Sequence, residues 1–110
     1  MAQTVNTPTT PVQRLRDASP AAADAFAALR KAVEESGPLE TKYRELINMG
    51  AFTTARMEAS FKTHCGRALD AGATPEECRQ AALLTFAATT GFSSVADALR
   101  WLEDVLAARK

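Results

Sequence analysis

The chain has 110 residues, 46% of them apolar, which is enough for one modest core. Its 13 basic and 13 acidic residues cancel to a net charge of zero, which disfavours binding to nucleic acid or to an anionic membrane. No stretch approaches the roughly 18 apolar residues of a membrane-spanning helix, and residues 1–10 carry no apolar segment typical of a signal peptide. We therefore expect a cytoplasmic protein without nucleic-acid or membrane partners.

Residues 1–11 are rich in Thr and Pro and are expected to form a flexible N-terminal arm, followed by a single helical domain over residues 12–110. Ser19 and Pro20 indicate the start of a first helix, because Ser caps helix N-termini and Pro fits the first turn. The Gly-Pro pair at residues 37–38 ends this helix. Its apolar face holds Phe26, Leu29 and Val33.

A second and a third helix are indicated by the 3.6-residue spacing of the apolar side chains. The second is expected to start near Leu39 and to fray near residues 53–56. The third is expected to run from about Met57 to Ala71, where Gly72 ends it. The second helix carries an apolar stripe of Leu39, Tyr43, Leu46, Ile47, Gly50 and Ala51.

Thr74 and Glu77 form a capping box with a proline at the first helical position, which predicts a fourth helix. This helix is apolar on nearly every side over residues 81–88, which favours burial against another subunit. Ser93 or Ser94 is expected to cap a last amphipathic helix. Because no segment indicates a strand, the sequence predicts an all-α bundle of about five helices that oligomerises through apolar helices.

A candidate site lies on the third helix, where Met57, Ser60 and His64 stand at positions i, i+3 and i+7 and therefore share one face. Glu45 lies on the second helix beside the apolar stripe, so we expect it to be partly buried and to need a polar partner. The candidates for that partner are Lys42, Arg44 and His64.

The two helices can bring Glu45 and His64 together, because a chain reversal near residues 53–56 lets them pack antiparallel. Eleven positions separate Glu45 from Arg56, which is about 16 Å of helix at 1.5 Å per residue. Eight positions separate Arg56 from His64, which is about 12 Å. Both side chains therefore reach the same level of the pair, and we expect them to be neighbours.

A combined pattern is carried by three segments, Lys42-Tyr-Arg-Glu-Leu-Ile47, Met57-Glu-Ala-Ser-Phe-Lys-Thr-His64 and Ala68-Leu-Asp-Ala-Gly-Ala-Thr-Pro-Glu-Glu77. Over roughly residues 39–92 it resembles the carboxymuconolactone decarboxylase superfamily, whose peroxidase branch is alkylhydroperoxidase D (AhpD). The register of that branch is K-x-R-E-L-I followed by C-x-x-C-x-x-x-H, in which Met57 and Ser60 occupy the places of the cysteine pair. The resemblance implies an AhpD-like helical bundle that assembles as a homo-oligomer, a trimer or hexamer.

The resemblance to the peroxidase branch implies that Glu45 orients His64 or relays its proton. A thioether and a hydroxyl cannot form a disulfide, so a peroxidase cycle on the C-x-x-C positions is not expected. The decarboxylase branch lacks the cysteine pair and keeps the histidine, but it usually carries a small residue in place of Glu45 and a longer N-terminal region with basic residues. This chain departs from both branches, and its N-terminal region offers only Arg14, Arg16, Arg30 and Lys31.

The leading hypothesis is therefore a lyase that performs cofactor-independent acid–base chemistry, of decarboxylase type by analogy with the family, on a small carboxylated or lactone metabolite. His64 is the expected general acid or base and Glu45 its orienting residue, without a metal ion. Ser60 and Met57 are expected to bind the substrate, in a pocket between the second and third helices.

Two alternatives remain beside this hypothesis. The first is a non-catalytic binding or structural member of the family, in which Glu45 forms a structural ion pair. The second is a thiol oxidoreductase that acts through Cys65 or Cys78. Cys65 points about 100° away from its neighbour His64 on the helix, and Cys78 lies in the first turn of a helix, so we expect both to be buried packing residues.

Overall fold

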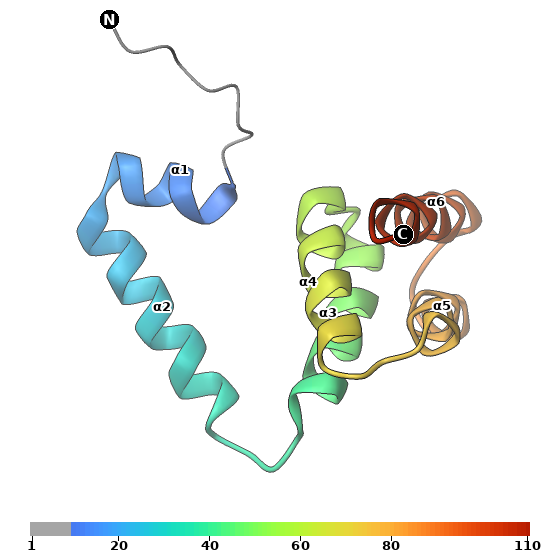
Figure 1. The fold of residues 1–110 in the computed structure, drawn as a ribbon, viewed down its shortest axis with the longest axis horizontal. Helices are drawn as coiled ribbons and strands as arrows, with labels where there is room; N and C mark the ends of the chain where they lie inside the picture. Colours follow the sequence, from blue (N-terminus) through green and yellow to red (C-terminus); the bar gives the residue numbers. More distant parts are fainter. Residues whose placement is uncertain (1–9) are drawn as a thin grey trace, which may run out of the picture. The chain divides into compact units, whose positions relative to one another are not determined.

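The computed structural model describes residues 10–110, which form six α-helices, one 3₁₀-helix and no strand (Figure 1). The all-α prediction is confirmed, with one helix more than the expected five or so. Residues 1–9 of the expected N-terminal arm lie outside the described residues, and a short helix begins at the end of that arm. The elements are α1 (Pro11–Ala18), α2 (Pro20–Glu34), α3 (Thr41–Ala55), α4 (Glu58–Asp70), α5 (Pro75–Leu83), η1 (Leu84–Ala87) and α6 (Phe92–Ala108).

The chain divides into two compact units, residues 1–38 and residues 39–110. In the first unit α1 packs against α2, and the Ser19 hydroxyl accepts a hydrogen bond of 3.1 Å from the Ala22 backbone N–H. This cap and the proline that follows it confirm the predicted start of α2. The single domain expected for residues 12–110 stays a prediction.

The second unit is built on the antiparallel pair of α3 and α4, which lie side by side, with α5 and α6 packed against them (Figure 1). The core forms where the four helices meet, and the Phe61 and Trp101 rings contact each other edge to face there, with centroids 5.6 Å apart. Cys65 and Cys78 are fully buried in this core, as expected for packing residues. The other buried members are Met49, Ala68, Ala73, Ala82, Ala98 and Leu102.

The turn between α3 and α4 depends on Arg56, which ends α3 in the left-handed conformation with φ of 59° and ψ of 44°. This conformation is unfavourable for a residue with a Cβ atom. The Arg56 guanidinium donates hydrogen bonds of 2.6 Å to Ser94 and 2.7 Å to Asp97, which hold the turn against α6. The predicted chain reversal at residues 53–56 is confirmed. Gly72, which follows the C-cap residue of α4, has the positive φ of 100° expected of a glycine after a helix end.

The capping box at the start of α5 is confirmed in both directions. The Glu77 N–H donates to the Thr74 hydroxyl at 3.0 Å, and the Thr74 N–H donates to the Glu77 carboxylate at 2.9 Å. The helix does not continue as an α-helix to residue 88, however, because it tightens into the 3₁₀-helix η1 after Leu83. The Thr85 hydroxyl donates to the Ala82 carbonyl at 2.7 Å in this tightened segment.

The predicted cap of the last helix is wrong. Gly91 is the N-cap residue of α6, and no side chain caps this helix. Ser94 already lies inside α6, where its hydroxyl accepts the hydrogen bond from Arg56 instead. None of the helices in residues 10–110 is long and apolar enough to cross a membrane.

The buried side of α3 is not its apolar stripe. The side chains that α3 buries are Glu45, Met49 and Thr53, which follow each other at intervals of four residues. The Thr53 hydroxyl is satisfied by the Met49 carbonyl at 2.8 Å. The stripe points elsewhere, since 59% of Ile47 remains exposed. The second unit thus buries a carboxylate and leaves an apolar helix face open.

Candidate functional site

Glu45 and His64 form the centre of the candidate site. The imidazole Nδ1 of His64 lies 2.8 Å from Oε1 of Glu45, and the pair bridges α3 and α4. Because an ionised carboxylate can only accept hydrogen bonds, Nδ1 is the donor. The Glu45 side chain is 5% exposed and the His64 side chain 14% exposed. The expected proximity of these two residues is confirmed.

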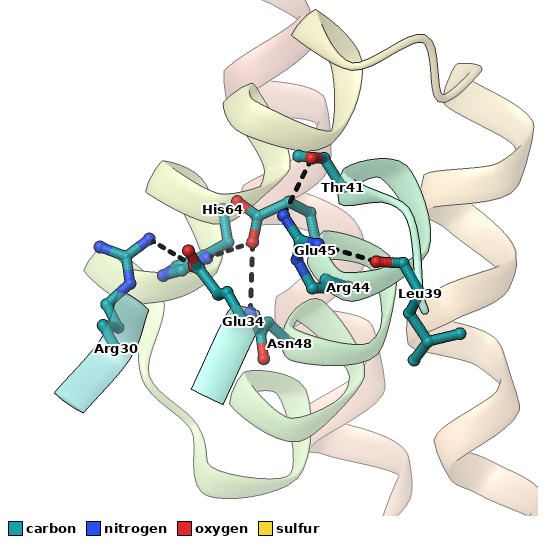
Figure 2. A network of polar contacts seen from close by, with 8 residues as sticks. All are labelled: Arg30, Glu34, Leu39, Thr41, Arg44, Glu45, Asn48 and His64. Atoms are coloured by element: carbon teal, nitrogen blue, oxygen red, sulfur yellow. Dashed lines mark hydrogen bonds and ion pairs between the residues drawn. The ribbon is translucent and has the colours of Figure 1, made fainter. Parts of the chain in front are cut away.

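Asn48 and Phe52 complete the site, although neither was predicted from the sequence. The Asn48 amide donates a hydrogen bond of 3.2 Å to the same Glu45 oxygen, so that Glu45 lies between Asn48 and His64 (Figure 2). The Phe52 ring lies against the imidazole of His64, with centroids 4.9 Å apart. Asn48 and Phe52 follow Glu45 at i+3 and i+7, so helical spacing from Glu45 is a signal that would have found them.

The site holds the imidazole in one orientation. Asn48 fixes the carboxylate, the carboxylate binds Nδ1, and Phe52 covers one side of the ring. Since the two ring nitrogens lie on different edges of an imidazole, Nε2 points away from Glu45. No residue in the range 10–110 forms a hydrogen bond with Nε2, which leaves this atom available for a proton transfer.

The other two candidate partners of Glu45 bind elsewhere. Lys42 forms an ion pair of 2.9 Å with Glu77, a hydrogen bond that raises the pKa of Lys42 above its ordinary value. Arg44 donates to the Leu39 carbonyl at 2.7 Å and to the Thr41 hydroxyl (Figure 2). The candidate partners Lys42 and Arg44 are therefore wrong, and His64 is the partner.

Ser60 and Met57 lie on α4 before His64. Ser60 is partly buried in the first turn, one turn before His64 and on the same face of the helix. Met57 is the N-cap residue of α4, and 46% of it is exposed. The structure thus places Ser60 on the face that carries His64 and Met57 just before the helix, and the role of both in substrate binding stays a prediction.

A model of the carboxymuconolactone decarboxylase family matches residues 20–104. The chain belongs to this family. No curated protein and no solved structure matches the chain at the level required for a significant similarity. The family match includes all of α3 and α4, and with them the Glu45–His64 pair. The family resemblance proposed from the sequence is thereby confirmed.

The cysteines of this carboxymuconolactone decarboxylase family member lie in the core and outside the candidate site. Both Cys65 and Cys78 are free thiols with no exposed surface. A hydrogen bond with Cys78 and burial both raise the pKa of Cys65 well above its ordinary value. Accepting that bond lowers the pKa of Cys78. Neither thiol is placed to replace the cysteine pair of the peroxidase branch.

A groove of about 450 Å³ runs along α3 on the side opposite to Glu45. It separates α3 from α5 and η1, and the apolar stripe of α3 forms one of its walls. The expected second and third helices are α3 and α4, and the pocket expected between them stays a prediction. The groove described here lies on the other side of α3. It is lined by Leu46, Ile47, Gly50, Ala51, Thr54, Glu77, Gln80, Ala81, Leu84, Thr85, Ala88 and Thr89.

Proposed function

We propose that this family member is a lyase that uses Glu45 and His64 as an acid–base pair on a small carboxylated or lactone metabolite. The observation that carries the proposal is the 2.8 Å hydrogen bond between Nδ1 of His64 and the buried Glu45 carboxylate. A carboxylate that holds Nδ1 fixes the tautomer and stabilises the imidazolium form, while Nε2 faces the substrate. Glu45 is then a positioning residue and His64 the catalytic one.

Decarboxylation is the proposed reaction type. The bond between the substrate carbon and its carboxylate breaks, CO₂ leaves, and the electron pair stays on the carbon, where an adjacent carbonyl delocalises it. Nε2–H of the imidazolium donates its proton to that carbon and forms the new C–H bond. The neutral imidazole then regains one proton from water. The reaction consumes one proton in total and needs no redox cofactor.

Ser60 extends the proposed substrate site along α4 and Met57 closes it at the start of the helix. Ser60 offers a hydroxyl on the same helix face as His64, one turn away. Met57 offers a flexible apolar side chain at the solvent-exposed end. Together the two residues suit a ligand that has a polar group near His64 and an apolar part near the start of α4.

The two alternative functions differ in how the structure supports them. A binding or structural member of the family is favoured by the 4% exposure of Glu45, because a buried pair of this kind also stabilises the contact between α3 and α4. A thiol oxidoreductase is disfavoured by the complete burial of Cys65 and Cys78, which keeps both sulfur atoms from a substrate. Two free thiols suit the reducing cytoplasm, where we place the protein.

We also propose that the protein assembles with copies of itself, as a trimer or hexamer, through the groove between α3 and η1. Apolar side chains gather around this groove, and both Ile47 and Leu84 are 59% exposed. Several large apolar side chains exposed next to one another are uncommon on the surface of a monomer. Phe86 and Phe92 continue it, with ring centroids 6.2 Å apart. A neighbouring copy that brings an apolar face of its own would cover it.

The catalytic proposal is tested by CO₂ release from β-keto acids and carboxylated lactones in D₂O. The wild type should release CO₂ and place one deuterium on the carbon that loses the carboxylate. His64→Gln should lower the rate by about 10²- to 10⁴-fold, the usual contribution of a general acid. Glu58→Gln, which alters an exposed glutamate of α4, is the matched control and should leave the rate unchanged. Turnover that persists in His64→Gln would remove His64 from the mechanism.

A further inference from the structure

Arg67 carries a buried cationic nitrogen without a hydrogen-bond acceptor. It lies on α4 three residues after His64, so the two side chains leave the same face of the helix one turn apart. Its Nη1 atom is shielded from solvent, yet no acceptor within residues 10–110 binds it. Arg67 was not predicted as a site residue, although its i+3 spacing from His64 can be read from the sequence.

The lack of a partner sets Arg67 apart from most arginines of the chain. Five others form ion pairs with carboxylates, namely Arg16, Arg30, Arg56, Arg100 and Arg109. A guanidinium remains charged at every accessible pH, and burying part of it without an acceptor costs free energy. Such a group is therefore expected to gain an anionic acceptor when its ligand binds.

We propose that Arg67 binds a carboxylate of the substrate beside the Glu45–His64 pair, an inference that rests on the function proposed above. Glu45 does not supply the missing acceptor, because its hydrogen bonds go to His64 and Asn48 and none joins it to Arg67. The planar guanidinium presents two parallel N–H donors, which match the two oxygens of a carboxylate. Arg67 is thus the positioning residue for the anionic end of the ligand.

The spacing on α4 limits the size of that ligand. One helical turn rises about 5.4 Å, so an anchored carboxylate and an atom that reaches Nε2 of His64 belong to one short molecule. Ser60 lies one turn before His64 on the same face, so three polar groups follow each other along the helix. A small acid fits this row, whereas a neutral molecule brings no opposite charge to the guanidinium.

The test uses acetate, succinate and benzoate as probes, with succinamide as the neutral counterpart of succinate. NMR signals of His64, the only histidine, report on binding near Nε2. At least one carboxylate should shift these signals saturably in the wild type, whereas succinamide should not. Arg67→Gln should weaken that binding by at least about tenfold, which is a typical loss for a charge-assisted hydrogen bond. Arg67→Lys should restore only part of it, because an ammonium lacks the planar pair of donors.

Arg79→Gln is the matched control, since Arg79 is an exposed arginine on α5, and it should bind the probes as the wild type does. A second measurement needs no variant at all. The best carboxylate should protect Arg67 of the wild type from modification by phenylglyoxal, as mapped by mass spectrometry, and should leave Arg79 unprotected. Equal binding by wild type and Arg67→Gln, or the absence of protection, would overturn the proposal.

The outcomes separate this inference from the proposed function. If no carboxylate shifts the His64 signals while His64→Gln abolishes CO₂ release, the acid–base pair stands and the role of Arg67 is refuted. If carboxylates bind through Arg67 but no CO₂ is released, the role of Arg67 stands and the decarboxylase proposal fails. If Arg67→Gln changes the oligomeric state and leaves binding intact, the guanidinium contacts another copy, which also overturns the proposal.

Discussion

Nδ1 of His64 and Oε1 of Glu45 are 2.8 Å apart although 19 residues separate them in the chain. The left-handed Arg56 reverses the chain between them, and the packing of α3 against α4 then brings them to the same level. The pair is the only hydrogen-bonded contact of a histidine with a carboxylate in residues 10–110, because His64 is the sole histidine. It links the fold to the chemistry proposed for this family member.

Removing the amide of Asn48 should destabilise the protein. Asn48→Ala deletes the donor at 3.2 Å from the buried Glu45 carboxylate and leaves that oxygen with one partner fewer. We expect a loss of about 1 to 2 kcal/mol in the free energy of unfolding, measured by urea titration. Thr63→Ala, at an exposed position of α4, is the control and should change it by less than about 0.5 kcal/mol. Equal effects of the two substitutions would mean that Asn48 does not support Glu45.

The protein should show no peroxidase turnover linked to lipoyl groups or to thioredoxin. Met57 and Ser60 cannot form a disulfide, and both thiols of the chain are buried. Iodoacetamide should accordingly modify Cys65 and Cys78 slowly in the native state and rapidly in urea. Turnover that is lost in Cys65→Ser would revive the thiol oxidoreductase, and turnover that survives the double change Cys65→Ser with Cys78→Ser would contradict our explanation of the missing cycle.

Glu77 should make the stability depend on acidic pH. The hydrogen bond from the Thr74 backbone and the one from Lys42 lower the pKa of Glu77 below its ordinary value. A carboxyl group with a lower pKa in the folded state binds fewer protons there, so its contribution is present above the unfolded pKa and lost as the pH falls through the folded one. Glu77→Gln should lower Tm at neutral pH, and the difference from wild type should shrink below about pH 4.

Glu76→Gln is the control for this pH dependence, because Glu76 is an exposed carboxylate in the same helical turn. It shares the favourable position near the positive end of α5 but forms neither half of the capping box. Its effect on Tm should be smaller than that of Glu77→Gln at neutral pH. A difference between Glu77→Gln and wild type that stays constant down to about pH 2 would exclude the charge of Glu77 as its cause.

The groove between α3 and η1 should be a contact between copies. Ile47→Glu places a charge on the exposed apolar wall of this groove and should dissociate the oligomer, as measured by sedimentation velocity. Val12→Glu, at another exposed apolar residue outside the groove, should leave the assembly intact. A wild-type protein that sediments as a monomer of 11.8 kDa at micromolar concentration would refute the oligomer itself.

Local sequence signals predicted the helix starts well, because their partners lie within a few residues. The capping box of Thr74 and Glu77 and the cap at Ser19 needed no tertiary information. The predicted cap of α6 was wrong because the partner of its serine lies far away in the sequence. Serines at 93 and 94 look like caps, but Ser94 is engaged by Arg56, 38 residues away, and α6 starts earlier at Phe92.

The burial pattern of α3 could not be predicted from hydrophobicity alone. Its apolar stripe, with Ile47, faces the open groove, while Glu45 faces α4 because His64 and Asn48 satisfy its carboxylate. A charge becomes a core residue only when its partners are known, and those partners depend on how α3 packs against α4. For the same reason the sequence could not predict that Nη1 of Arg67 is buried without an acceptor in residues 10–110.

The most direct test of the central claim is the tautomer of His64, read from the ¹⁵N shifts of its two ring nitrogens at a pH where the ring is neutral. Nδ1 lies 2.8 Å from the Glu45 carboxylate, and an ionised carboxylate only accepts, so the wild type should hold the hydrogen on Nδ1 and leave Nε2 bare. Glu45→Gln should shift the population toward the Nε2–H tautomer, whereas Glu58→Gln should not. A wild-type protein with its hydrogen on Nε2, or a tautomer population that Glu45→Gln leaves unchanged, would contradict the acid–base pair.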